Sequence, residues 1–181
     1  MAKRQARLSA RRVPSGRALQ GAPSETRPSG HARQAALAWL WTILVMVFVV
    51  ALDQLSKAAV RKSIVPGETR SVLPGIQLVD TRNQGVAFGF LPGRHVVVTV
   101  LVGVALLVLL VYFARHRDKP LIWLPTGMLL GGALGNIIDR LRVGSVTDFV
   151  KFPLGWPPFN LADASITLGV LLLLIVVEKR E

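Results

Sequence analysis

Four long hydrophobic segments constrain the fold of this chain more than any other feature. Residues 35–52 and 121–138 each run for 18 residues without a charge, and residues 96–114 run for 19. A fourth segment, 159–177, carries Asp163 as its only charged residue. At about 1.5 Å per residue, each segment is roughly 26–29 Å long as a helix, which matches the hydrocarbon core of a bilayer. Four such segments in 181 residues leave too little chain for a soluble domain.

The predicted architecture is therefore a membrane all-α fold of four transmembrane helices with a small β-rich cap on the outer membrane face. The helices are expected to span about 35–57, 96–114, 121–141 and 159–177. The cap is expected over 61–95, where the turn sequences VPGE, LPG and TRNQG separate short stretches such as IQLVD and GVAFGF. These stretches have the composition of strands, and the turns between them favour hairpins over a helix.

The N-terminal segment differs in composition from the rest of the chain. Residues 1–34 are rich in Ala, Arg, Ser, Gly and Pro, and they hold eight basic residues against one acid, Glu25. We expect a disordered basic cytoplasmic tail, because such a composition buries too little apolar surface to offset ordering entropy. The transmembrane domain then occupies 35–181. The tail is compatible with a solvated segment that reinforces topology, a segment held against anionic lipid, or an organellar transit peptide.

Basic residues also predict the orientation in the membrane. Thirteen Lys and Arg residues lie in the two terminal segments and in 115–119, against eight in the longer connections 61–95 and 139–160. Lys and Arg are enriched on the cytoplasmic side of membrane proteins. Both termini are therefore expected in the cytoplasm, with the two longer connections outside.

The first polar cluster at membrane depth is the motif DQLSK at the outer end of the first predicted helix. Asp53 and Lys57 are four residues apart, so they share a helix face and can form an ion pair. Buried charges in a membrane are costly unless they are paired, and they commonly mark functional sites. The motif alone does not separate a structural ion pair from a direct catalytic role.

The second cluster is the motif GGALGNIIDR in the third predicted helix. Gly127, Gly131 and Gly135 recur every four residues, which opens one helix face to close backbone packing. Asn136 and Arg140 follow on a neighbouring stripe. A guanidinium offers a fork of donors for a carboxylate or a peptide carbonyl. We therefore expect this stripe to face the interior of the bundle.

The third cluster consists of Asp148 and Asp163, which are 15 residues apart with three prolines and a glycine between them. These breakers force the chain to turn back, so both carboxylates should meet at the outer edge of the bilayer. Two carboxylates in a low-dielectric site tend to share one proton, which supplies one base for water and one acid for a carbonyl. The alternative is that each one caps a helix or pairs with Lys151 or Arg140.

The sequence gives little support for other kinds of catalytic or binding site. The histidines His31, His95 and His116 are scattered, and neither a His-Glu-x-x-His motif nor a Gly-x-Ser-x-Gly motif is present. The chain contains no cysteine, which excludes disulfides and thiolate catalysis. Basic residues are spread over the membrane flanks, a distribution that does not favour nucleic-acid binding.

Five motifs in this order, DQLSK, NQGVAFGF, GGALGNIIDR, VTDF and FNLAD, closely resemble the bacterial prolipoprotein signal peptidase family (signal peptidase II). The resemblance covers about 38–177. It implies an aspartic endopeptidase of the bacterial cytoplasmic membrane that removes signal peptides from diacylglyceryl-modified prolipoproteins, cutting before the lipidated cysteine. On this resemblance Asp148 and Asp163 are the catalytic pair, at the outer membrane face.

The resemblance also implies supporting residues, partners and inhibitors. The residues are Asn83, Gly85, Asn136, Arg140, Asn160, Ala162, Asp53 and Lys57. The four polar residues Asn83, Asn136, Arg140 and Asn160 are expected to hold the substrate backbone and orient the pair, and Asp53 and Lys57 to support the site. The implied partners are prolipoprotein substrates and membrane lipid, and the implied inhibitors are cyclic peptides of the globomycin type. The resemblance implies no metal and no other cofactor, and the expected state is a monomer.

Two other classes of protein fit parts of the pattern. A small membrane transporter would use its intramembrane charges to line a pathway, and should spread them through the membrane depth. Here the charges cluster towards one face. A non-catalytic lipid-binding scaffold would keep its function without Asp148 or Asp163.

Overall fold

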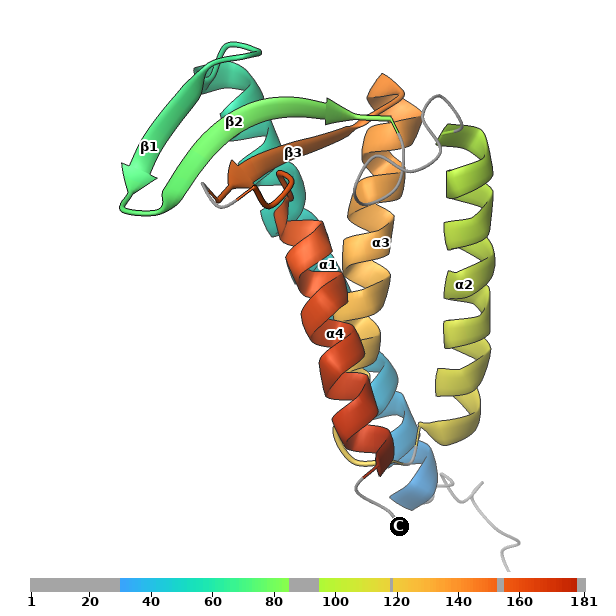
Figure 1. The fold of residues 1–181 in the computed structure, drawn as a ribbon. Coiled ribbons are helices and arrows are strands. Elements are labelled where there is room, and N and C mark those ends of the chain that lie inside the picture. The colour runs from blue at the N-terminus through green and yellow to red at the C-terminus, as the bar shows by residue number, and fades with distance from the viewer. Residues whose placement is uncertain (1–29, 85–94, 118, 153–154, 179–181) are drawn as a thin grey trace, which may run out of the picture.

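The computed structural model describes residues 30–84, 95–117, 119–152 and 155–178. Within these ranges four helices lie side by side as an elongated bundle, and a small sheet crosses one end of it (Figure 1). The elements in chain order are α1 (Gly30–Ser63), β1 (Thr69–Leu73), β2 (Ile76–Asn83), α2 (His95–His116), α3 (Trp123–Val143), β3 (Val146–Lys151) and α4 (Leu161–Glu178).

The four helices fall where the hydrophobic segments predict them. α1 starts at Gly30, five residues before the expected position, and continues to Ser63, past the predicted end of the span; residues 1–29 of the predicted tail lie outside the described ranges. By length and composition α1, α4 and residues 99–116 of α2 can each cross a membrane. α3 is less apolar because it carries the glycines and polar residues of GGALGNIIDR.

α3 lies at the centre of the bundle and contacts each of the other three helices. Its glycines make this possible. A Cβ at Gly127 would lie 2.7 Å from Cβ of Val45, and one at Gly131 would lie 2.8 Å from Cβ of Val49, both on α1. On the neighbouring stripe, a Cβ at Gly132 would lie 2.5 Å from the backbone oxygen of Ala162 in α4. The predicted glycine stripe is therefore the surface on which α1 packs, and the adjacent stripe packs on α4.

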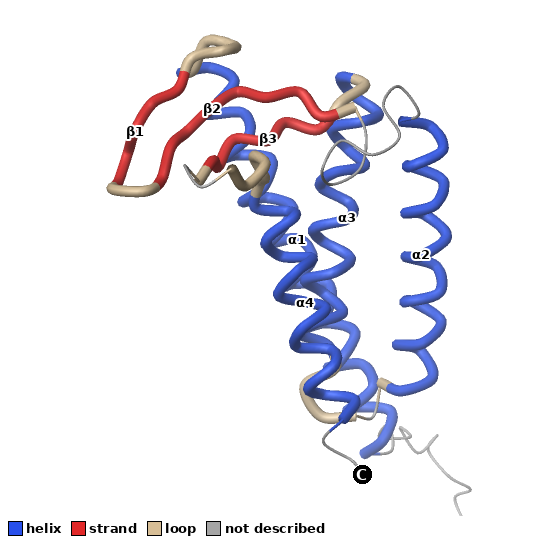
Figure 2. The backbone as a smooth tube through the Cα atoms, viewed as in Figure 1, coloured by secondary structure: helices blue, strands red, loops and turns tan. Residues whose placement is uncertain are grey.

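The sheet has three antiparallel strands in the order β1-β2-β3 (Figure 2). The stretch IQLVD forms a strand as predicted, within β2. GVAFGF lies outside the described residues. The third strand, β3, comes from the connection between α3 and α4 and was not predicted. It pairs Val146 with Asn83 and Asp148 with Thr81. The strands therefore extend beyond 61–95, and one of the two aspartates lies on a strand.

The sheet is attached to the bundle through the extra length of α1. Val60 near the end of α1 and Ile64 just beyond it form a buried apolar cluster with Phe149 of β3. Because side chains alternate along a strand, Phe149 faces this cluster while its neighbour Asp148 faces the other side. The cluster therefore fixes the strand that carries Asp148.

Candidate active site

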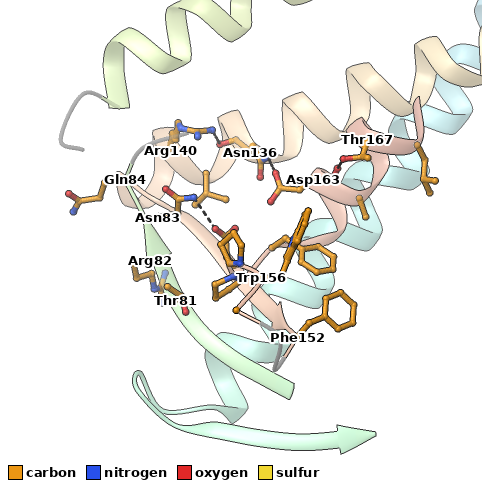
Figure 3. A pocket seen from close by; sticks show the side chains of 18 residues that line it. Thr81, Arg82, Asn83, Gln84, Asn136, Arg140, Phe152, Trp156, Asp163 and Thr167 are labelled. Carbon is orange, nitrogen blue, oxygen red and sulfur yellow. Dashed lines mark hydrogen bonds between the residues drawn. The ribbon is translucent and has the colours of Figure 1, made fainter. Parts of the chain in front are cut away.

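A pocket of about 1080 Å³ opens between β2, β3, α3, α4 and the connection that precedes α4 (Figure 3). Asp148 and Asp163 both line it, one from the sheet and one from the helix bundle. Apolar side chains form much of the rest of the wall. The other lining residues are Thr81, Arg82, Asn83, Gln84, Asn136, Arg140, Val146, Phe152, Gly155, Trp156, Pro157, Pro158, Phe159, Ala164, Thr167 and Leu168.

Asp148 is held on β3 by two side-chain amides. Asn83 of β2 donates to Oδ2 at 3.0 Å, and Asn160 donates to Oδ1 at 2.6 Å. Asp148 as a residue is 3% exposed. Burial, followed by the negative charge of Asp163, raises the pKa of Asp148 to about 6, while the two amide hydrogen bonds oppose this shift. The side chain therefore holds a proton far more readily than an ordinary aspartate.

Asp163 lies in the first turn of α4, where its backbone N–H donates to Oδ1 of Asn160 at 2.9 Å. The backbone N–H of Asn160 donates in return to Oδ2 of Asp163 at 3.3 Å. This is a capping box, in which the two residues satisfy each other's backbone donors. The other oxygen, Oδ1, accepts from Asn136 of α3 at 2.8 Å (Figure 3). Asp163 does cap a helix, and it also presents its carboxylate to the pocket.

Asn160 connects the two carboxylates and is completely buried. Its side-chain amide bonds Asp148, and its backbone amide and side-chain oxygen bond Asp163. The same Nδ2 also lies 3.3 Å from Oδ1 of Asn136. One buried asparagine thus fixes the strand aspartate relative to the helix aspartate.

Asp53 and Lys57 form a buried ion pair of 2.8 Å, and both side chains are fully excluded from solvent. They do not line the pocket. Nζ of Lys57 donates to Oδ1 of Asn136 at 3.0 Å, and Oδ1 of Asp53 accepts from the backbone N–H of Ala162 at 3.0 Å. Of the two alternatives left open by the motif, the geometry supports an ion pair beneath the site over direct contact with a bound substrate.

The remaining predicted residues are placed as follows. Arg140 lines the pocket and its Nη1 donates to the backbone oxygen of Asn136 at 3.2 Å. Ala162 is completely buried, with its backbone against Asp53 and Gly132. Gly85 lies outside the described residues. Within the described ranges, no group of three or more acidic or histidine side chains is arranged to hold a metal ion.

Asp139 of α3 is a buried carboxylate that was not among the predicted site residues. Oδ2 of Asp139 lies 3.3 Å from Nζ of Lys57 and accepts the backbone N–H of Thr147 at 3.0 Å. Gln54 of α1 also donates to its other oxygen at 3.2 Å. The sequence does indicate the position of Asp139. It follows Gly135 by four residues, so it continues the glycine stripe and lies on the face of α3 that packs against α1.

The chain is similar to known proteins over most of its length. Residues 45–178 match a family model described as Signal peptidase (SPase) II. A lipoprotein signal peptidase of Halothermothrix orenii is 38% identical over 139 residues, covering 76% of this chain and 95% of that protein. A lipoprotein signal peptidase of Syntrophomonas wolfei is 44% identical over 140 residues, covering 75% and 93%.

Solved structures show the same likeness in three dimensions. A bacterial membrane enzyme determined by the in meso method at 2.3 Å resolution superposes with a TM-score of 0.72 and 33% sequence identity, over 76% of this chain and 87% of that one. A second, at 1.9 Å resolution, gives a TM-score of 0.70 and 32% identity, over 77% and 94%.

Proposed function

The chain belongs to the signal peptidase II family, and on this premise we propose that it removes signal peptides from diacylglyceryl-modified prolipoproteins by an aspartic mechanism. Asp148 and Asp163 are the catalytic pair, and the cut falls before the lipidated cysteine. Family membership decides against the transporter and scaffold alternatives. The single observation that carries the aspartic mechanism is that both carboxylates line one pocket and are joined through Asn160.

The chemistry follows from the protonation of the pair. Two carboxylates at a buried site ionise one at a time, so the resting pair holds one proton. The ionised member takes a proton from a water molecule as that water attacks the scissile carbonyl. The protonated member donates a hydrogen bond to the carbonyl oxygen as negative charge develops on it. The tetrahedral intermediate then breaks, and the proton taken from water passes to the leaving amine.

The pocket lies at the end of the bundle that carries the sheet, and this position suits a lipid-anchored substrate. We place this end at the outer membrane face, with all four helices crossing the membrane and both termini in the cytoplasm. Water is available at that depth and scarce at the bilayer centre. Phe152, Trp156 and Leu168 give the wall apolar surface for the lipidated precursor. Globomycin-type peptides would occupy the same pocket, and the protein acts as a monomer without a cofactor.

Asparagine substitution tests the mechanism directly. Asn has nearly the shape of Asp and cannot ionise, so Asp148→Asn and Asp163→Asn should each abolish cleavage of a purified lipidated precursor in detergent. Thermal unfolding confirms that each variant is folded. A folded Asp148→Asn or Asp163→Asn protein that cleaves at the wild-type rate would rule out the aspartic pair.

A further inference from the structure

Asp139 is a buried carboxylate outside the pocket that the proposed reaction does not use directly. Its side chain is 2% exposed, yet it meets groups from two elements besides its own helix. Lys57 and Arg61 of α1 approach it at 3.3 and 3.6 Å, and Thr147 of β3 donates its backbone N–H at 3.0 Å. The bond to Thr147 crosses the turn between α3 and β3, which contains Gly144 in the left-handed conformation.

Thr147 is the residue immediately before Asp148, and its side chain points away from the pocket. Val146 and Asp148 line the pocket, whereas Thr147 is completely buried on the opposite face of the strand, as alternation along a strand requires. There its Oγ1 accepts from Nη1 of Arg61 at 3.0 Å. The backbone next to Asp148 is therefore tied to α3 through Asp139 and to α1 through Arg61.

Asp139 also shares Lys57 with the other half of the site. Nζ of Lys57 donates to Asn136 at 3.0 Å, and Asn136 donates to Asp163 at 2.8 Å. The ammonium group thus has two carboxylate partners, Asp53 and Asp139, and one amide partner that leads to the catalytic pair. In a buried network each charge depends on its neighbours for compensation, so removal of one member moves the rest.

We propose that Asp139 is a positioning residue for the aspartate pair, acting on Asp148 through the backbone of Thr147 and on Asp163 through Lys57 and Asn136. This inference rests on the proposed function. Asp139 does not touch substrate, so its loss should lower kcat and leave KM near the wild-type value. Misplacement of a catalytic group by about 1 Å can cost on the order of a hundred-fold in rate.

Two substitutions of graded severity test the proposal. Asp139→Asn keeps an oxygen for the Thr147 N–H and loses the charge, so we expect kcat about ten-fold lower. Asp139→Ala removes both the accepting oxygen and the negative charge, so we expect kcat about a hundred-fold lower. Hydrogen exchange provides a readout independent of activity: amide exchange in a peptide covering 144–152 should be faster in Asp139→Ala than in the wild type. KM should remain near the wild-type value in both.

The matched control is Thr42→Val. Thr42 of α1 is also almost completely buried, and its Oγ1 donates to the backbone oxygen of Ala38 at 2.8 Å and lies 3.4 Å from the backbone oxygen of Trp123, at the start of α3. It should retain wild-type kcat. If Asp139→Asn and Asp139→Ala match Thr42→Val in kcat, or if the loss lies in KM, the positioning role is wrong. Asp148→Asn in the same assay separates the two proposals, because activity in that variant would overturn the aspartic mechanism itself.

Discussion

The side-chain amide of Asn160 donates to Oδ1 of Asp148 at 2.6 Å, and this bond joins the sheet to the helix bundle at the two aspartates of the pocket. Asn160 is also the residue that caps α4, so its position is fixed by the helix it begins. The separation of the two carboxylates is therefore set by one helix cap. A helix cap depends on residues close together in the sequence, and here it fixes the strand aspartate relative to the helix aspartate.

Replacement of Asn160 by alanine should remove most activity. Asn160→Ala loses the donor to Asp148 and the side-chain oxygen that accepts from the backbone of Asp163, so the link between the two residues is lost. We expect kcat to fall about a hundred-fold, as for other misplaced catalytic groups, and the free energy of unfolding to fall by about 1 kcal/mol through the lost cap. Cleavage of a lipidated precursor and thermal unfolding measure the two effects.

Ser165→Ala is the matched control for Asn160→Ala. Ser165 is a buried polar residue of the same helix, and it donates to the backbone oxygen of Met128 at 3.0 Å, away from the carboxylates. Its loss should affect stability with little change in kcat. Equal kcat in the two variants would show that Asn160 acts only through the stability of α4.

The raised pKa of Asp148 predicts a dependence of stability on pH. The folded protein favours the protonated form of Asp148. The stability that this preference adds is complete below the ordinary pKa of 3.8 and is lost as the pH rises through about 6. The free energy of unfolding should fall by about 3 kcal/mol in total, most of it between pH 4 and pH 7, at 1.36 kcal/mol per pKa unit. Asp148→Asn cannot ionise at this position and should show a smaller fall. Thermal unfolding in detergent at each pH provides the measurement.

Glu68→Gln serves as the control of opposite sign. Glu68 is exposed, and hydrogen bonds from the Val65 backbone N–H and from Arg70 lower its pKa. The ionised Glu68 side chain contributes to the free energy of unfolding above its ordinary pKa, and this contribution is lost in acid. Glu68→Gln should therefore keep the wild-type fall in the free energy of unfolding between pH 4 and 7. A wild-type protein that gains stability over this range, or an Asp148→Asn variant that loses as much as the wild type, would contradict the prediction.

The helices and the aspartate pair were accessible from sequence because they depend on local features. Hydrophobic length predicts each helix, and the breakers between Asp148 and Asp163 predict that the chain turns back between them. The glycine period predicted close packing of α3, which is confirmed against Val45 and Val49 of α1. In each case the signal lies within about twenty residues of chain, in a window where periodicity and turn chemistry are informative.

The third strand and Asp139 were not predicted because both depend on partners far away in the sequence. VTDFVK becomes a strand because β2 offers a pairing edge, and the contact between Asn83 and Asp148 spans 65 residues. Asp139 is satisfied by Lys57 of another helix and by a backbone N–H of that strand. Neither partner can be read from the surrounding residues, since context of this kind overrides local propensity.

Alanine at Gly131 should loosen the contact between α3 and α1. Its Cβ would lie 2.8 Å from Cβ of Val49 and 2.9 Å from the backbone oxygen of Met46, so the two helices must move apart. Overpacking of this kind costs about 1–3 kcal/mol. Gly103→Ala in α2 is the control, because nothing lies within 4 Å of its Cβ and alanine favours a helix. Thermal unfolding should show a lower Tm for Gly131→Ala only; an unchanged Tm would contradict the close packing.

The orientation in the membrane can be tested by single-cysteine labelling, since the natural chain contains no cysteine. Ser71 lies exposed on β1, and Arg117 lies exposed at the far end of the bundle, just after α2 (Figure 1). If the sheet faces outward, a membrane-impermeant maleimide should modify Ser71→Cys in intact spheroplasts. Arg117→Cys should react only after the membrane is opened, because its side then faces the cytoplasm.

Denatured samples of both cysteine variants should label equally, which controls for expression and for thiol reactivity. Precursor cleavage by each variant shows that the labelled population is the active one. Protection of Ser71→Cys together with labelling of Arg117→Cys in intact spheroplasts would reverse the orientation. The pocket and its aspartates would then open to the cytoplasm, where a precursor whose mature part is exported could not present its cleavage site to them.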